Sequence, residues 1–270
     1  MNLLKKISHY MATSKIGWKV GIKYRFNFFI TTLTTPLNII IFYFLWKAIF
    51  DYTGIEIIKG FTFNAMIQYY VLSMIVGFFI WAETDKWIAQ DVRRGHIVSM
   101  FIVPVRFMWQ HLAFEAGINF LGVILNLIPV FLIGFLFFGL NIAPVFYFTS
   151  FLVSVVLAFL LAFFLSFNLG LTAFWMKRIT GLRRVKRALG LFLGGGMIPL
   201  TFFPESVQKI LHFLPFEYTR YVPINIYLGN YSVSYVFLQL GLQVAWILAL
   251  YLLSVFVYKR AFRQFAGAGV

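Results

Sequence analysis

The sequence contains no cysteine and few charged residues, above all few acidic ones. Its 270 residues include 23 Lys or Arg but 8 Asp or Glu, so that 11% are charged while 61% are hydrophobic. The absence of cysteine excludes a disulfide framework, a thiolate metal site and a cysteine nucleophile. A soluble domain is roughly a quarter charged and about half apolar. Because so few charges cannot keep so much apolar surface in water, the composition excludes an ordinary soluble enzyme and indicates a chain solvated by lipid.

Patterns that bind nucleotides or metals are also missing. No Gly-x-x-x-x-Gly-Lys-[Ser/Thr] sequence occurs, so the chain cannot hold a nucleotide in a P-loop. The four histidines lie in different segments, and none belongs to a His-Glu-x-x-His pattern. We therefore expect no catalytic residue, no metal site and no cofactor bound by this chain.

Six apolar stretches are candidates for transmembrane helices, which need about 20 residues each. They are residues 26–50, 61–82, 107–138, 142–176, 188–203 and 233–257. The fifth stretch is only 16 residues long and is rich in Gly and Pro. The sequence therefore predicts an all-α membrane protein with a single domain over residues 1–270, six transmembrane helices and a broken fifth span.

Positive charge is confined to short segments between the apolar stretches. Nineteen of the 23 Lys and Arg residues lie in 1–25, 83–106, 177–187 and the tail after residue 257, and four lie on the opposite side: Lys47, Lys59, Lys209 and Arg220. Because cytoplasmic loops carry the excess of Lys and Arg, we expect a multi-pass protein of the cell (plasma) membrane with both termini in the cytoplasm. The basic run 177–187 is most simply an anchor on that side, in contact with anionic lipid rather than nucleic acid.

Residues 1–25 differ in pattern from the six spans. One helical face collects Leu3, Leu4, Ile7, Tyr10 and Met11, while Lys5, Lys6 and His9 lie off it. This spacing predicts an amphipathic helix on the inner leaflet, with a frayed basic tail as the alternative. The apolar run that starts at Phe26 is too long for the core of a cleavable signal peptide.

The loop 83–106 mixes charged residues with apolar ones at helical spacing. Trp87, Ile88 and Val92 recur as on one side of a helix, and Gly95 can end that helix before an apolar run that reaches Pro104. The pattern predicts a short cytoplasmic helix. This helix is either a docking element for a partner protein or a simple connector between two spans.

Glycine and proline interrupt the chain after residue 193. Gly194, Gly195 and Gly196, followed by Pro199 and Pro204, cannot form a long straight helix. Pro204 can open a new helix, and residues 204–230 are expected to lie along the outer surface. Irregular backbone at membrane depth survives only inside protein or beside water. The segment is therefore either a gate beside a pathway or a helix that ends early for packing reasons.

Polar side chains form a stripe on each of two spans. On 107–138 they are His111, Glu115, Asn119, Gly122 and Asn126, and on 26–50 they are Asn27, Thr31, Thr35 and Asn38. Such stripes either join helices or line a wet pathway. For Glu115 the simplest expectation is a pair with Arg106 or His111 near the inner interface. No cationic or anionic pocket is expected within the spans.

Three stretches late in the chain resemble the corresponding segment of ABC-2-type transporter permeases. They are Gly-Gly-Met-Ile-Pro-Leu-Thr-Phe-Phe-Pro at 195–204, Leu-Pro-Phe-Glu-Tyr at 214–218 and Pro-Ile-Asn-Ile-Tyr-Leu-Gly at 223–229. The run Asp-Val-Arg-Arg-Gly at 91–95, which leads to Pro104, is similar to the first cytoplasmic loop of that family. The resemblance extends along the whole chain and is strongest to short six-span bacterial and archaeal permeases that work with a separate ATPase.

The resemblance implies the permease subunit of an ATP-driven exporter. In such proteins the first cytoplasmic loop holds a coupling helix, which would place Trp87, Asp91, Arg93, Arg94 and Gly95 at the ATPase. The segment 194–204 would be the broken outer end of the fifth span. Two ATPase subunits, which bind ATP and Mg, and a second permease chain, identical or paralogous, would complete the assembly. Contact of the run 177–187 with the ATPase is a further option.

Two other classes of function stay open from the residues alone. An intramembrane lipid-modifying enzyme would use Glu115 and His111 as an acid–base pair, but a convergent set of catalytic groups is lacking. A passive channel or an assembly factor would need no ATPase, but the polar stripes are weak as a pore lining.

Overall fold

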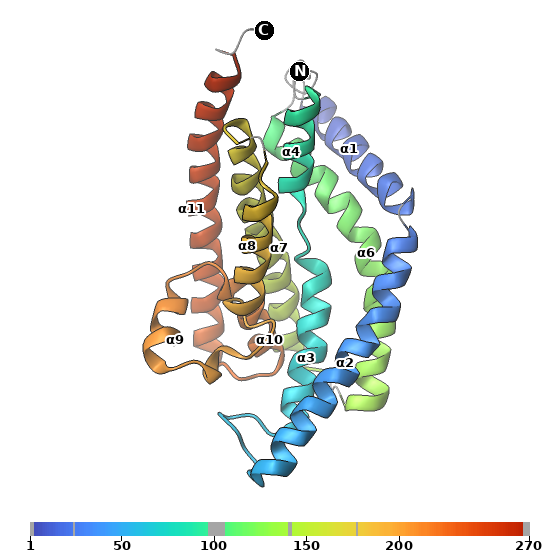
Figure 1. Cartoon of the computed structure of the whole chain (residues 1–270), viewed down its shortest axis with the longest axis vertical. Coiled ribbons are helices and arrows are strands. Elements are labelled where there is room, and N and C mark those ends of the chain that lie inside the picture. The colour runs from blue at the N-terminus through green and yellow to red at the C-terminus, as the bar shows by residue number, and fades with distance from the viewer. Residues whose placement is uncertain (1–2, 24, 97–105, 140–141, 177, 267–270) are drawn as a thin grey trace.

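The structure is a computed structural model that describes residues 3–23, 25–96, 106–139, 142–176 and 178–266 (Figure 1). Within these residues it consists of helices and turns without a β-strand, which confirms the predicted all-α class for this part of the chain. The apolar run 97–103 and Pro104 lie outside the described residues. The α-helices are α1 (Leu3–Lys23), α2 (Arg25–Thr53), α3 (Phe63–Phe79), α4 (Thr84–Arg94), α6 (Phe107–Phe138), α7 (Val145–Leu171), α8 (Thr180–Phe192), α9 (Glu205–His212), α10 (Tyr221–Tyr227) and α11 (Val233–Ala266). Short 3-10 turns are η1 (Thr172–Phe174), η2 (Leu200–Phe202) and η3 (Glu217–Thr219).

Four helical segments of the described residues are long and apolar enough to cross a membrane. They are Phe63–Arg94, Phe107–Phe138, Val145–Phe174 and Val233–Ala261, and they overlap the second, third, fourth and sixth predicted spans. The first of the four joins α3 to α4, but α3 has no charged residue whereas five of the 11 residues of α4 are charged. The apolar part of that segment is therefore α3. Over the first predicted span the chain is also helical, as α2.

The fifth predicted span differs from the structure. We expected a basic loop over 177–187 and a span over 188–203, but α8 runs from Thr180 to Phe192 and the chain then turns, apart from the single turn η2. Much of the basic run is thus the first half of a helix rather than a loop. Its charges are tolerated there because α4 and the turn before it supply acidic partners, which a count of apolar residues cannot reveal.

The buried core centres on α3 and α7. Helix α3 contacts α2, α6, α7 and α10, and α7 contacts α4, α10 and α11. Every residue of α10 is buried. The start of α1 and the end of α11 lie at the same end of the molecule as α4, while α9 and α10 lie toward the other end (Figure 1). This arrangement separates α4 from the glycine- and proline-rich segment by most of the length of α8.

Glycines allow α1 to lie directly against α6. A Cβ atom on Gly17 would be 2.2 Å from the carbonyl oxygen of Phe114, and one on Gly117 would be 2.0 Å from that of Ser14. No larger residue fits at either position without moving a backbone. On α1 itself, Ile7 and Met11 of the predicted apolar face are exposed. Helix α1 therefore packs through its glycines and leaves apolar side chains without a partner in this part of the chain.

We predict that Gly117→Ala lowers the free energy of unfolding by roughly 1–3 kcal/mol, because the added methyl group forces α1 away from α6. The measurement is unfolding of the purified chain by SDS in mixed micelles. Gly241→Ala on α11 is the matched control, because a Cβ atom there meets nothing within 4 Å. Equal stability of the two variants would show that the close contact of α1 with α6 is unimportant.

Candidate functional site

The buried carboxylate of Glu115 accepts hydrogen bonds from the start of α4. Glu115 of α6 is 1% exposed, and its two carboxylate oxygens accept hydrogen bonds from the backbone N–H of Glu83 at 2.9 Å and from the hydroxyl of Thr84 at 2.7 Å. The first N–H groups of a helix have no partner within the helix, and a negative charge beside them is favourable. Glu115 thus fixes where α4 begins. Its expected partners Arg106 and His111 are not its hydrogen-bond partners among the described residues, so that expectation was wrong.

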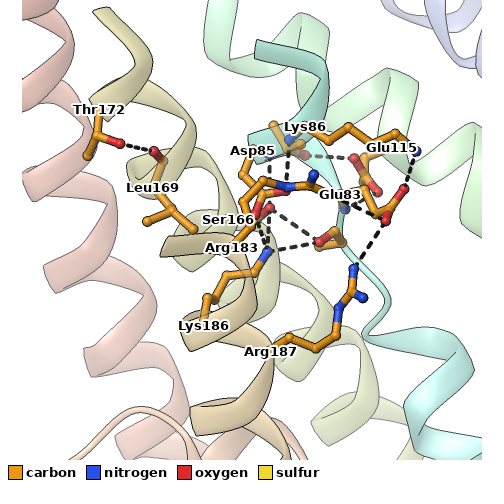
Figure 2. A network of polar contacts seen from close by, with 12 residues as sticks. Glu83, Asp85, Lys86, Glu115, Ser166, Leu169, Thr172, Arg183, Lys186 and Arg187 are labelled. Atoms are coloured by element: carbon orange, nitrogen blue, oxygen red, sulfur yellow. Dashed lines mark hydrogen bonds and ion pairs between the residues drawn. The ribbon is translucent and has the colours of Figure 1, made fainter. Parts of the chain in front are cut away.

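Acidic residues at the start of α4 form ion pairs with α8 (Figure 2). Asp85, which is buried, lies 2.8 Å from Nζ of Lys186 and 3.3 Å from Nε of Arg183. Glu83 lies 3.6 Å from Arg183, 3.5 Å from Arg187 and, on its own side, 2.9 Å from Lys86. We call this set, with Glu115 and Ser166, the α4 polar cluster; its members are Glu83, Asp85, Lys86, Glu115, Ser166, Arg183, Lys186 and Arg187.

Ser166 of α7 joins the same cluster. Its hydroxyl accepts hydrogen bonds from the backbone N–H of Asp85 at 3.1 Å and from Lys186 at 3.0 Å. Lys186 also donates to the carbonyl oxygen of Ala82 at 3.1 Å. The cluster therefore connects four elements, because α4 is bound to α6 through Glu115, to α7 through Ser166 and to α8 through three basic side chains.

The opposite end of α4 faces outward. Gly95 ends the helix with φ +72°, a conformation that glycine adopts without strain, as the sequence predicted. Arg93, Arg94 and Gly95 are exposed, and Asp91 is partly buried. Trp87, nearer the start, packs edge-on against Phe114 of α6. A cavity of about 460 Å³ lies beside this end, between Val92 and Arg93 of α4 and the turn that carries Trp175 and Arg178. The five predicted coupling residues are thus on one short helix, with the two arginines accessible.

The glycine-rich segment after α8 is fastened to α3 and α10. The hydroxyl of Tyr69 donates to the carbonyl oxygen of Gly195 at 2.6 Å, and that of Tyr70 donates to Met197 at 2.6 Å. The N–H of Tyr221 donates to the carbonyl oxygen of Gly194 at 3.1 Å. Pro199 directly precedes η2 and Pro204 directly precedes α9. The backbone N–H of Gly196 donates to the carbonyl oxygen of Leu191, at the end of α8, at 2.8 Å. The break expected at 194–204 is present, and the carbonyl groups of Gly194, Gly195 and Met197 accept hydrogen bonds from α10 and α3.

The polar stripe on α6 faces the interior of the protein. Asn119 donates to the carbonyl oxygen of Trp81, and Asn126 donates to Gly122 in its own helix. His111 is buried against the rings of Phe107 and Phe167. No hydrogen bond joins His111 to Glu115 among the described residues, and the partners of Glu115 are Glu83 and Thr84. No group of three or more His, Cys, Asp or Glu residues that could hold a metal occurs among the described residues.

The stripe on α2 is only partly described. The side chains of Asn27, Thr31 and Thr35 lie outside the described residues. Asn38 is exposed and donates to the carbonyl oxygen of Thr34 in its own helix at 3.0 Å. At this position the stripe therefore does not join α2 to another helix within the described residues.

A cavity of about 290 Å³ separates α8 from α3 and α7. Its wall includes five ion-paired members of the α4 polar cluster and, in addition, Arg220; the five are Glu83, Asp85, Arg183, Lys186 and Arg187. From the distribution of charge we expected Arg220 on the side opposite the basic segments, and no partner was predicted for it. In the structure its guanidinium Nη1 donates to the carbonyl oxygen and the hydroxyl of Ser73, in the middle of α3, both at 3.1 Å. The expectation that the spans contain no cationic pocket was therefore wrong.

Sequence reasoning missed Asp85, Arg183, Lys186 and Arg220 as members of a site. A signal was present for the first three. Residues 183, 186 and 187 share one helical face, and acidic residues are so rare in this chain that the two at 83 and 85 stand out. For Arg220 the sequence offers no such signal, because only the folded chain brings it beside α3.

We predict that Asp85→Asn lowers the free energy of unfolding by roughly 2–3 kcal/mol. This loss is smaller than that for a fully buried ion pair, because the side chains of Arg183 and Lys186 are 20% and 24% exposed and are partly screened by solvent. Asp51→Asn, at an exposed position, is the matched control. Unfolding in mixed micelles measures the free energy of unfolding of both variants. A double-variant cycle with Lys186→Met measures the interaction energy between Asp85 and Lys186. A cost for Asp85→Asn no greater than for Asp51→Asn would contradict a stabilising cluster.

Comparison of the sequence with known proteins identifies the family of the chain. A family model described as "ABC-2 family transporter protein" matches residues 37–269. The matched range contains α3, α4, the α4 polar cluster and the broken segment. A search of the curated proteins finds no match. Because the family model covers most of the chain, and because the chain has several membrane-crossing helices, this multi-pass membrane protein belongs to the ABC-2 transporter family.

Proposed function

We propose that the chain is the membrane-spanning permease subunit of an ATP-driven exporter in the cell membrane. Two ATPase subunits bind ATP and Mg, and a second permease chain, identical or paralogous, completes the transport pathway. The chain crosses the membrane six times, with α2 and the segment that begins with α8 as the first and fifth crossings and both termini in the cytoplasm. Helix α1 lies at the inner leaflet, where its exposed Ile7 and Met11 contact lipid. Membership in the family supports this proposal.

The observation that carries the proposal is the contrast between the two ends of α4. The first turn is held by ion pairs and hydrogen bonds to α6, α7 and α8. The last turn exposes Arg93 and Arg94 beside a cavity of about 460 Å³. A helix with one anchored and one accessible end suits the transmission of a displacement from a partner into the bundle. ATP binding by the partner would thus bias the membrane helices between two arrangements.

The segment 194–204 acts in this proposal as the outer gate. It is the point at which the fifth crossing stops being helical, and it is attached through the hydroxyls of Tyr69 and Tyr70 to α3. Helix α3 continues through a short turn into α4. A displacement of α4 therefore has a direct covalent route to the helix that holds the gate.

We predict that Arg93→Ala with Arg94→Ala reduces the recovery of a P-loop ATPase by roughly tenfold, because two exposed cations of the docking surface are lost. The chain is captured from native membranes in mild detergent, and co-purifying proteins are identified by mass spectrometry. The matched control is Lys259→Ala with Arg260→Ala, which removes two exposed cations from the last turns of α11. The end of α11 lies at the same end of the molecule as α4 (Figure 1).

Recovery of the ATPase with the wild type and with the control, but not with the α4 variant, is the expected result. Stable isolation of all three proteins without an ATPase would refute the proposed function. Equal recovery with both variants would remove α4 as the docking element.

A further inference from the structure

Arg220 is a cation beside a membrane-spanning helix without an acidic partner. Among the described residues, no carboxylate oxygen lies within 4.0 Å of its guanidinium, and its Nε is shielded from solvent without a hydrogen bond. The nearest acidic residue in sequence, Glu217, pairs instead with His212 at 2.8 Å. The neutral oxygens of Ser73 engage only Nη1. Placing an ionisable side chain at membrane depth costs free energy, and such residues mark functional sites by default. A bound anion would offset this cost for the guanidinium of Arg220.

Two glycines make room for the guanidinium at this position. A Cβ atom on Gly77 of α3 would be 3.2 Å from Nη2, and one on Gly196 would be 3.1 Å from Nη1. The planar group therefore lies in a slot between α3 and the glycine-rich segment. A guanidinium held in one place with free donors is preorganised for a planar or tetrahedral oxyanion, which it binds through paired hydrogen bonds.

The cavity beside Arg220 combines positive charge with apolar walls. Its charged lining consists of Arg220, Arg183, Lys186 and Arg187 together with Glu83 and Asp85. The two carboxylates are already paired with α8, so the lining has four cations and two acids and keeps an excess of positive charge. The remainder of the wall includes Ala162, Leu165 and Leu191. This combination matches an amphiphile rather than a small hydrated ion.

We propose that this cavity binds the anionic phosphate headgroup of an amphiphile, with Arg220 as the principal ligand. The proposal rests on the proposed function, and it names anionic amphiphiles as the class of transported substrate. The volume of about 290 Å³ accommodates a headgroup but not a long acyl chain. The apolar part of the ligand must therefore extend out of the cavity toward lipid.

The test measures binding to the full chain, purified in neutral detergent without an ATPase. The probes are a fluorescent short-chain phosphatidic acid and the matching phosphatidylcholine, with inorganic phosphate as competitor. We expect Arg220→Gln to weaken phosphatidic acid binding at least about tenfold, the loss for one charge-assisted contact. Arg220→Lys should retain part of the affinity. Lys209→Gln, which removes an exposed cation of α9, should change it less than about twofold.

A second variant tests the cavity without touching the cation. Ala162 lines the cavity, so Ala162→Leu reduces the cavity volume and should weaken the binding of phosphatidic acid. This variant decides the question if Arg220→Gln does not fold. Equal affinity of Arg220→Gln and wild type, or of phosphatidylcholine and phosphatidic acid, would overturn the proposal. Competition by inorganic phosphate as effective as by unlabelled phosphatidic acid would assign the site to a free anion and also overturn it. Because no ATPase is present, this result stands or falls separately from the co-purification experiment.

Discussion

The neutralisation of Asp85 at the start of α4 is the interaction on which the arrangement of the site depends. A carboxylate that is 1% exposed cannot remain charged there without partners. Its partners Arg183 and Lys186 come from α8, a helix that has no buried residue of its own. Apolar packing therefore does little to place α8 at this end, and the ion pairs do most of it. Buried ion pairs add little net stability compared with apolar packing, but they define geometry because each charge is costly when its partner is absent.

The same interaction creates the cavity. Long basic side chains hold α8 at a distance from α3 and α7, because their charged ends, rather than the helix backbone, make the contact. At the other end of α8, the tyrosine hydroxyls of α3 bind the carbonyl groups of the glycine-rich segment. Helix α8 is thus attached at both ends with space between it and the bundle. Arg220 lines that space.

This arrangement also relates α4 to the broken segment 194–204, the two regions to which we assign a proposed role. Helix α4 is tied to α6, α7 and α8 at its first turn, and α3 connects it covalently to the level of the broken segment. Elements joined by discrete ion pairs switch between packings more readily than they deform continuously. The architecture is therefore consistent with a membrane domain whose inner and outer ends change together, as the proposed coupling to an ATPase requires.

The sequence alone determined that this is an all-α membrane protein, because apolar runs and sparse charge leave no other solvent but lipid. It also located α4 and its end at Gly95, because helical spacing and a glycine terminator act within one turn of chain. It misplaced the start of α8 and the partner of Glu115, and it did not reveal the hydrogen bonds of Arg220 to Ser73. Each of these depends on a contact between residues more than 30 positions apart, and periodicity carries no information on such pairs. Only the tertiary structure decided them, because a buried charge is stabilised by whichever partner the fold brings within reach.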